Sequence, residues 1–136
     1  MNGIRGASGA ILIWNLLGVA ACAMQVTADR AALARSDPIG AQAFAAMPGW
    51  AWAAYFVAVI AGTVGAVLLI MRRRKAVALF ALSLMGVVVQ FGWTFLVFGL
   101  GERKGWGTAI LPLLIFAIGV AQLLYARRVA HHNLLT

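Results

Sequence analysis

Four long apolar blocks constrain this chain more than any other feature of its sequence. They cover residues 8–28, 50–71, 76–100 and 107–126, and none has a charged residue in its interior. A hydrocarbon core of about 30 Å requires roughly 20 residues of helix, and each block meets that length. None shows the alternation of apolar and polar residues that marks the roughly 10-residue strands of a membrane barrel. The sequence therefore predicts an all-α integral membrane protein, a single domain built as a four-transmembrane-helix bundle.

The composition supports a lipid environment rather than an aqueous one. Of the 136 residues, 64% are hydrophobic and only 10% are charged, whereas a soluble domain is nearer half apolar and a quarter charged. The net charge of +8 would suit a nucleic-acid partner, but the basic residues lie at the block ends, where they meet lipid headgroups. The expected partner is therefore the lipid bilayer, and no nucleic-acid binding is expected.

The charges between and beyond the blocks predict the orientation of the chain. The turn between the second and third blocks carries four consecutive basic residues, Arg72, Arg73, Arg74 and Lys75. Basic residues concentrate in cytoplasmic loops. If this turn is inside, Arg5, Arg127 and Arg128 are inside too, which gives seven inner basic residues against four outer ones. The sequence thus predicts a multi-pass protein with both termini in the cytoplasm.

The connection between the first two blocks, residues 30–49, is the longest. Asp37 followed by Pro38 is a helix-start signal, because a carboxylate accepts hydrogen bonds from free backbone N–H groups and proline fits the first turn. We expect a short interfacial helix after this point, and we expect residues 30–35 to continue the first helix beyond the lipid. Residues 101–105, GERKG, indicate only a short turn between the last two blocks.

Each block carries one face of small or weakly polar residues at helical spacing. The members are Asn15, Gly18, Cys22 and Gln25 in the first block, Gly62 and Gly65 in the second, Ser83, Gly86, Gln90 and Thr94 in the third, and Gly119 and Gln122 in the fourth. Residues three and four apart share a helix face. Small residues let helix backbones approach closely, and amides bond across helices in lipid. These faces are predicted to pack the helices or, alternatively, to line a cavity for a small neutral solute.

The depth of the amide and hydroxyl groups refines this prediction. Gln25 and Gln90 lie in the outer half of their blocks, whereas the remaining polar members lie in the inner half: Asn15, Ser83 and Gln122. We therefore expect hydrogen bonds between helices within each of the two layers.

The only cysteine admits two interpretations. Residues 19–22, VAAC, match a lipoprotein-type processing site, and the preceding residues have the charged start and apolar run of an export signal. The apolar run nevertheless continues past Cys22 to Thr27, as a spanning helix requires. We prefer a retained span in which Cys22 is a small residue at a helix contact.

The chain lacks the residue patterns of an enzyme or a cofactor site. It has no nucleophile–base pair, no paired carboxylates and no phosphate-binding loop, and its three acidic residues all fall outside the blocks. His131 and His132 are adjacent, so they do not share a helix face as metal ligands would need to. We expect no catalytic residue, no cofactor and no metal site.

Three segments resemble a group of small proteobacterial four-span proteins: AACAMQVTAD, MPGWAWAAYFVAV and RRRKAVALFALSLMGVVVQFGWTF. Members of this group often carry the label "sugar transporter", with no mechanism assigned. The resemblance covers most of the chain and implies four retained spans, a bacterial inner-membrane location and a transport function. It brings no binding residues with it.

Two functions are compatible with these observations. The first is a small non-enzymatic protein that packs helices as an accessory subunit of a larger membrane assembly. The alternative is a homo-oligomeric transporter or pore for a small neutral solute such as a sugar, with a dimer expected because four short helices enclose little volume. A proton relay is not expected, because such relays use carboxylates or histidines inside the membrane.

Overall fold

A computed structural model describes the backbone of residues 2–132 and all of their side chains except those of residues 2–5, 30 and 108. The described residues form helices joined by short connections, and they include no strand. Four of its helical segments are long and apolar enough to cross a membrane: α1 (Asn2–Thr27), α4 (Gly49–Ile70), α5 (Lys75–Gly92) continued by η1 (Trp93–Val97), and α7 (Ile110–His131). The predicted four-helix membrane fold is thereby confirmed at this level.

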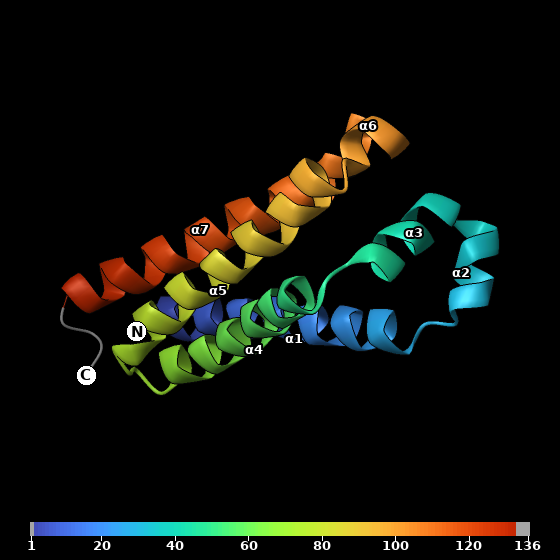
Figure 1. Cartoon of the computed structure of the whole chain (residues 1–136). Helices are drawn as coiled ribbons and strands as arrows, with labels where there is room; N and C mark the ends of the chain where they lie inside the picture. Colours follow the sequence, from blue (N-terminus) through green and yellow to red (C-terminus); the bar gives the residue numbers. More distant parts are fainter. Residues whose placement is uncertain (1, 133–136) are drawn as a thin grey trace.

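The helices are arranged around a central α4–α5 hairpin (Figure 1). α1 packs on α4 and α7 packs on α5, while α1 and α7 make no extensive backbone contact with each other within residues 2–132. The start of α1, the end of α7 and the α4–α5 turn lie at one end of the bundle, which we call the basic end. The opposite end, which we call the loop end, holds the short connecting helices.

A tight turn at the basic end joins α4 to α5. Arg72 adopts a left-handed backbone with φ 58°, and the Arg73 N–H donates to the Leu68 carbonyl oxygen at 2.8 Å. Such a left-handed residue with a backward hydrogen bond satisfies the last carbonyls of a helix. The four basic residues thus occupy a compact turn that lets α4 and α5 lie antiparallel.

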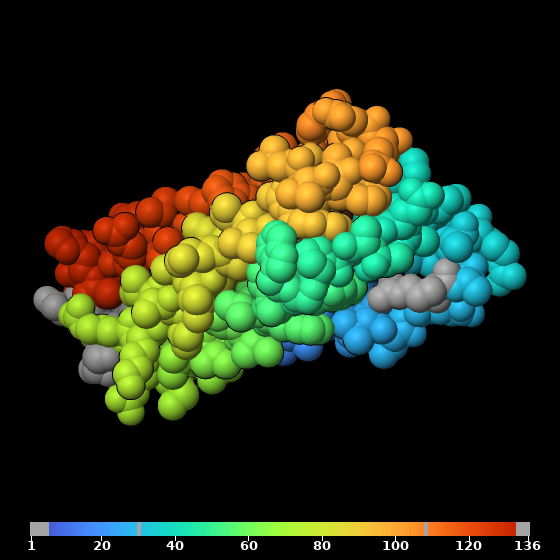
Figure 2. Space-filling view, in the orientation of Figure 1, coloured from blue at the N-terminus to red at the C-terminus, as the bar shows by residue number. Residues whose placement is uncertain are grey.

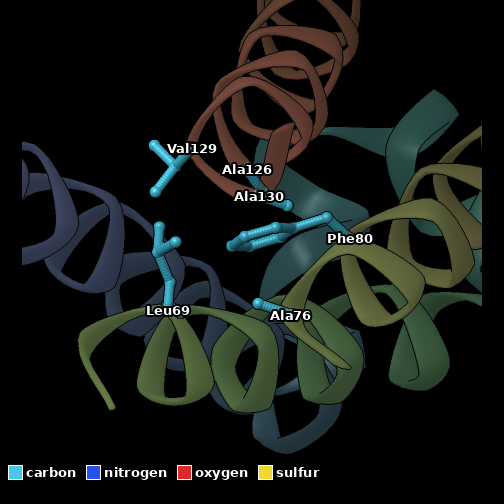
Figure 3. Packing of buried hydrophobic residues seen from close by; sticks show 7 residues of the cluster. Leu69, Ala76, Phe80, Ala126, Val129 and Ala130 are labelled. Atoms are coloured by element: carbon cyan, nitrogen blue, oxygen red, sulfur yellow. The ribbon is translucent and has the colours of Figure 1, made fainter. Parts of the chain in front are cut away.

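All four long helices contribute to an apolar cluster near the basic end (Figure 3). Its buried members are Ala66, Leu69, Ala76, Phe80, Ala126, Val129 and Ala130, and α1 packs Ile11 and Leu12 against them. Because the cluster includes residues beyond position 126, α7 is longer than the sequence predicted at this end. Helix α7 also starts at Ile110 rather than at residue 107, since Trp106–Ala109 form a separate 3-10 turn, η2.

The third span ends differently from the prediction. The α-helix stops at Gly92, and Trp93–Val97 form one turn of π-helix in which the Phe98 N–H donates to the Trp93 carbonyl oxygen at 2.9 Å. Trp93 is buried, with 6% of its surface exposed, and stacks on Phe98 at 5.8 Å between ring centroids. Leu100–Lys104 then form the short helix α6 rather than the expected turn.

The connection from α1 to α4 contains two short helices, α2 (Arg30–Ser36) and α3 (Pro38–Ala46). Asp29 caps α2 by accepting from the Ala31 N–H at 3.0 Å. The prediction that residues 30–35 continue the first helix is therefore wrong, because they belong to the separate helix α2. Asp37 caps α3 by accepting from the Gly40 N–H at 3.1 Å, which confirms that helix-start prediction. Figure 2 shows the side chains of α3 and α6 meeting over the loop end.

Candidate functional site

The small-residue faces predicted on the second and third blocks meet in the α4–α5 seam. A Cβ placed on Gly86 would lie 2.6 Å from the Ala54 carbonyl oxygen and 3.0 Å from the Ala58 amide nitrogen. The Ser83 hydroxyl donates to the Ala58 carbonyl oxygen at 2.6 Å. The two backbones therefore approach as closely as glycine and alanine permit.

One amide pair joins α1 to α7 across the bundle. Asn15 Nδ2 donates to Gln122 Oε1 at 3.1 Å and to the Ile11 carbonyl oxygen of its own helix at 2.8 Å. A side chain at Gly62 would overlap Asn15 Oδ1, so glycine at this point of α4 lets the Asn15 amide keep its position. This pair confirms the cross-helix amide bond predicted for the inner layer.

The outer layer is organised differently from the prediction. Gln90 Nε2 donates to Thr94 Oγ1 at 3.3 Å and approaches Met47 Sδ at 3.8 Å. Within the described residues no hydrogen bond joins Gln90 to Gln25. The reason is spatial, because α1 and α5 stand on different walls of a cavity at this depth.

This cavity is the candidate functional site, with a volume of about 490 Å³. It lies between α1, α4, α5 and α7 and extends to α3 and α6 at the loop end. Near the basic end it stops at Phe80 and the Asn15–Gln122 pair, beyond which the apolar cluster fills the bundle. Because α1 and α7 do not pack on each other along most of their length, one side of the cavity faces the surrounding lipid in a membrane.

The sequence-predicted residues divide between this cavity and the helix contacts. The cavity is lined by Asn15, Gly18, Gln25, Ser83, Gln90, Thr94, Gly119 and Gln122. Gly62, Gly65 and Gly86 lie in helix contacts instead, with Gly65 facing the Phe80 ring, and Cys22 is buried in α1. The basic residues Arg127 and Arg128 are exposed on the last turns of α7.

Several residues that line the cavity were not predicted from the sequence. Trp14 and Trp93 line the wall from within apolar blocks, where nothing in the sequence separates an inward ring from one that faces lipid. Asp37, Phe44 and Lys104 come from the connections and line the mouth at the loop end. Only the folding of α3 and α6 toward each other brings these residues to the cavity.

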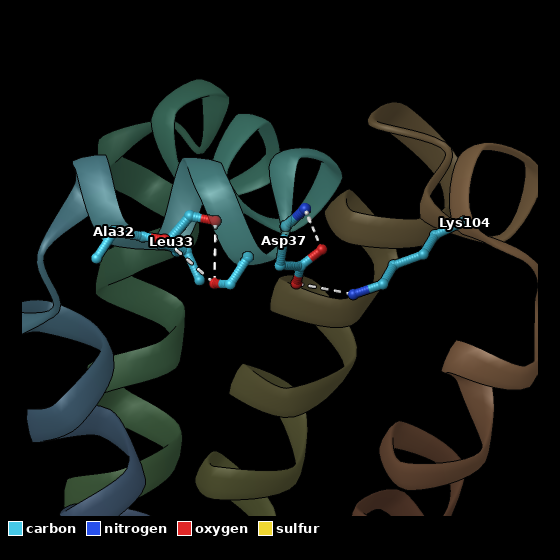
Figure 4. Close-up of polar contacts among 6 residues, drawn as sticks. Ala32, Leu33, Asp37 and Lys104 are labelled. Carbon is cyan, nitrogen blue, oxygen red and sulfur yellow. Dashed lines mark hydrogen bonds and ion pairs between the residues drawn. The ribbon is translucent and has the colours of Figure 1, made fainter.

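An ion pair joins the two connections at this mouth (Figure 4). Lys104 Nζ lies 2.8 Å from Asp37 Oδ2, while Asp37 Oδ1 caps α3. The hydrogen bond from Lys104 lowers the pKa of Asp37 below its usual value. Both side chains are about a third exposed, so the pair is of the surface kind, worth at most about 1 kcal/mol.

Removing this carboxylate should have a modest, pH-dependent effect. Since the pKa of folded Asp37 is depressed, its contribution to stability is full above the unfolded value of about 4 and is lost as the pH falls through the folded value. We expect Asp37→Asn, which keeps a capping oxygen, to cost under about 1 kcal/mol at pH 7, and Asp37→Ala about 1–2 kcal/mol. Detergent unfolding at pH 7 and pH 3 measures both; equal costs at the two pH values would contradict the pairing.

Comparison of the chain with protein-family models, with curated proteins and with solved structures finds no match. The resemblance to proteins labelled "sugar transporter" therefore stays a prediction. Among the described residues, no group of three or more His, Cys, Asp or Glu side chains is placed to hold a metal ion.

Proposed function

We propose that this protein binds a small neutral, largely apolar molecule in the cavity between its helices and acts as a membrane carrier for it. The observation that carries the proposal is the cavity itself. Its volume of about 490 Å³ falls within the roughly 300–1,000 Å³ of small-molecule sites. The cavity forms within a single chain, so the proposal does not need the second copy that the sequence argument invoked.

The chemistry of the wall supports a neutral and mostly apolar ligand. The charged lining residues, Asp37 and Lys104, lie in the connections and bond each other, while the spanning helices contribute uncharged side chains. The Ser83 hydroxyl already donates its hydrogen bond to the Ala58 carbonyl oxygen, so this hydrogen is not free for a ligand. A sugar has hydroxyl groups on every side, and each buried polar group without a partner costs free energy. A molecule with a single polar end therefore suits this wall better than a sugar.

The orientation follows from the charges. We place the basic end in the cytoplasm of a bacterial cell, at the inner membrane, because it holds the four-residue basic turn and the exposed Arg127 and Arg128. The loop end and the mouth of the cavity then face the opposite side.

Single cysteines introduced into a Cys22→Ala background test this orientation in intact cells. Ser36→Cys at the loop end and His132→Cys at the basic end both alter exposed residues. An impermeant maleimide is expected to label Ser36→Cys at least tenfold more than His132→Cys, because only the first faces the outside. The reverse pattern would overturn the proposed orientation, and equal labelling after cell lysis is the control.

A neutral photoreactive hydrocarbon tests the binding proposal. Octane carrying a diazirine, photolysed in vesicles that hold the protein, should label cavity residues as well as lipid-facing ones. Gly18→Leu should lower cavity labelling several-fold, because Gly18 lines the cavity and its added side chain meets open space. Gly6→Leu is the matched control on the same helix, since Gly6 is exposed and lies off the cavity. Labelling restricted to lipid-facing residues in the unmodified protein would contradict the proposal.

A second candidate is the accessory-subunit function. In the most apolar stretch of each span, 11% of residues are buried in α1 and in α7, against 33% in α4. The outer helices thus leave much apolar surface that either lipid or another protein can cover. Purification in a mild detergent decides between the two, because a stable hetero-complex favours the subunit and a chain without partners favours the carrier.

A further inference from the structure

We infer that the Asn15–Gln122 amide pair recognises the polar end of the ligand, and that this end is a neutral oxygen, a hydroxyl or a carbonyl. The apolar remainder of the molecule extends from the pair toward the loop end. This inference rests on the proposed function and adds to it the class of ligand and the direction in which the ligand lies.

The hydrogen bonds fix which way both amides point. Asn15 Nδ2 has two hydrogens, and both are used, one on the Ile11 carbonyl oxygen and one on Gln122 Oε1. A flipped Asn15 amide would set its oxygen against the Ile11 carbonyl oxygen, so this assignment is the one that the network allows. Because Gln122 Oε1 is the acceptor of the pair, its Nε2 is left as the free donor.

That donor has no partner among the described residues. Gln122 is only 7% exposed, yet it lines the cavity. A buried amide donor without an acceptor costs about as much as a lost hydrogen bond. An oxygen of the ligand would satisfy the Gln122 N–H, whereas a cationic group would be repelled by it and a pure hydrocarbon would leave it unpaired.

The rest of the wall sets the direction. Next to the pair, on its loop-end side, Leu17, Leu84 and Ile115 contribute apolar side chains to the wall, which cannot form hydrogen bonds with a ligand. Toward the loop end, Gln90 already donates to Thr94, and Asp37 already pairs with Lys104. Gln25, Tyr55 and Trp93 also line this part of the cavity without a hydrogen bond to a described residue, but Gln25 and Tyr55 are only half-buried. Gln122 is the most buried of the amide side chains that line the cavity and lies at its deep end, so we expect a ligand with one oxygen to enter oxygen first.

Two photoreactive octanols test this direction in the unmodified protein. One carries its diazirine next to the hydroxyl and the other carries it near the methyl end. The first is expected to label residues at the deep end, around Asn15, Phe80 and Gln122, and the second residues near the mouth, around Phe44 and Trp93. The opposite order, with the hydroxyl at the mouth, would overturn the inference.

Gln122→Met tests the recognition itself, because methionine keeps the length of the side chain and removes the donor. Cavity labelling by the photoreactive octanol should fall roughly threefold to tenfold relative to labelling by the photoreactive octane, the loss expected for one hydrogen bond. Gln42→Met is the matched control, since Gln42 is exposed on α3 and lies off the cavity. Because Gln122→Met also frees the Asn15 N–H that Gln122 Oε1 accepts, the double variant Asn15→Leu/Gln122→Met is measured beside it. An unchanged ratio in both variants would refute the inference.

These outcomes separate the inference from the proposal on which it rests. If neither probe labels the cavity of the unmodified protein, the proposed function fails. If both label it and the ratio is the same for Gln122→Met and for the double variant, the cavity binds small molecules but Gln122 does not choose them. Should Gln122→Met fail to fold, the two octanols in the unmodified protein still decide the direction.

Discussion

Gly86→Val is expected to abolish the folded bundle. The first atom of any side chain at this position would lie 2.6 Å from the Ala54 carbonyl oxygen and 3.0 Å from the Ala58 amide nitrogen. Both obstacles are backbone atoms, which cannot rotate away as a flexible side chain can. Overpacking a core usually costs about 1–3 kcal/mol, and here α4 and α5 must move apart along the largest interface of the fold, so we expect a loss of at least about 3 kcal/mol.

Gly92→Val is the matched control for this variant. Gly92 lies on the same helix, and a Cβ added there meets nothing within 4 Å. Both variants replace glycine by the same β-branched residue, so they share its effect on the helical backbone. Unfolding in mixed micelles of mild detergent and SDS should leave Gly92→Val close to the unmodified protein. Equal stability of the two variants would show that α4 and α5 are not in close contact at Gly86.

Phe80→Ala should give the next largest loss. Phe80 is 2% exposed, and its ring points from α5 into the cluster formed with α4 and α7 (Figure 3). In water, such a truncation costs a transfer part and a cavity part. In lipid the transfer part largely disappears, because the lipid around separated helices is as apolar as the cluster. The cavity part, for the roughly 100 Å³ removed, leaves about 2 kcal/mol.

Phe116→Ala provides the comparison on the surface. Phe116 lies on α7 with 40% of its surface exposed, and no cavity forms when its ring is removed there. The same unfolding measurement should place Phe116→Ala within about 0.5 kcal/mol of the unmodified protein. A Phe80→Ala loss as small as this would mean that the apolar cluster at the basic end does not hold the four helices together.

The sequence was sufficient to predict the four spans because the hydrocarbon core imposes one simple requirement of length and polarity. The pairing of small-residue faces also followed from sequence, since glycine, alanine and serine at helical spacing have few other uses in lipid. Asp37 followed by Pro38 predicted the start of α3 for a similar reason, because helix capping depends only on residues in the first turn. Each of these features depends on residues within one or two helical turns.

Other features depend on contacts that no single helix contains. The π-helical turn at Trp93 forms where Trp93 stacks on Phe98 and packs with Met47 and Ala51 from elsewhere in the chain. The extra turn of α7 depends on the packing of Val129 in the apolar cluster at the basic end. The cavity itself exists because α1 and α7 diverge, and the angle between helices is set by the whole packing arrangement rather than by the stripe on either one.

The Asn15–Gln122 bond illustrates the boundary between these two kinds of feature. Depth alone placed both amides in the inner layer, so their pairing could be expected. The sequence could not predict which of the two amides keeps a free N–H donor, because this depends on the hydrogen bond from Asn15 to the Ile11 carbonyl oxygen. The inference that Gln122 recognises the polar end of the ligand rests on that last detail.

Native mass spectrometry of the protein extracted from its own membrane tests the central claim, that the cavity holds a small neutral molecule. The unmodified protein is expected to carry an additional neutral mass that is absent from Gly18→Leu, whose side chain enters the cavity and narrows it, and present in Gly6→Leu. A bound mass that persists in Gly18→Leu, or an unmodified protein that carries none, would contradict the account.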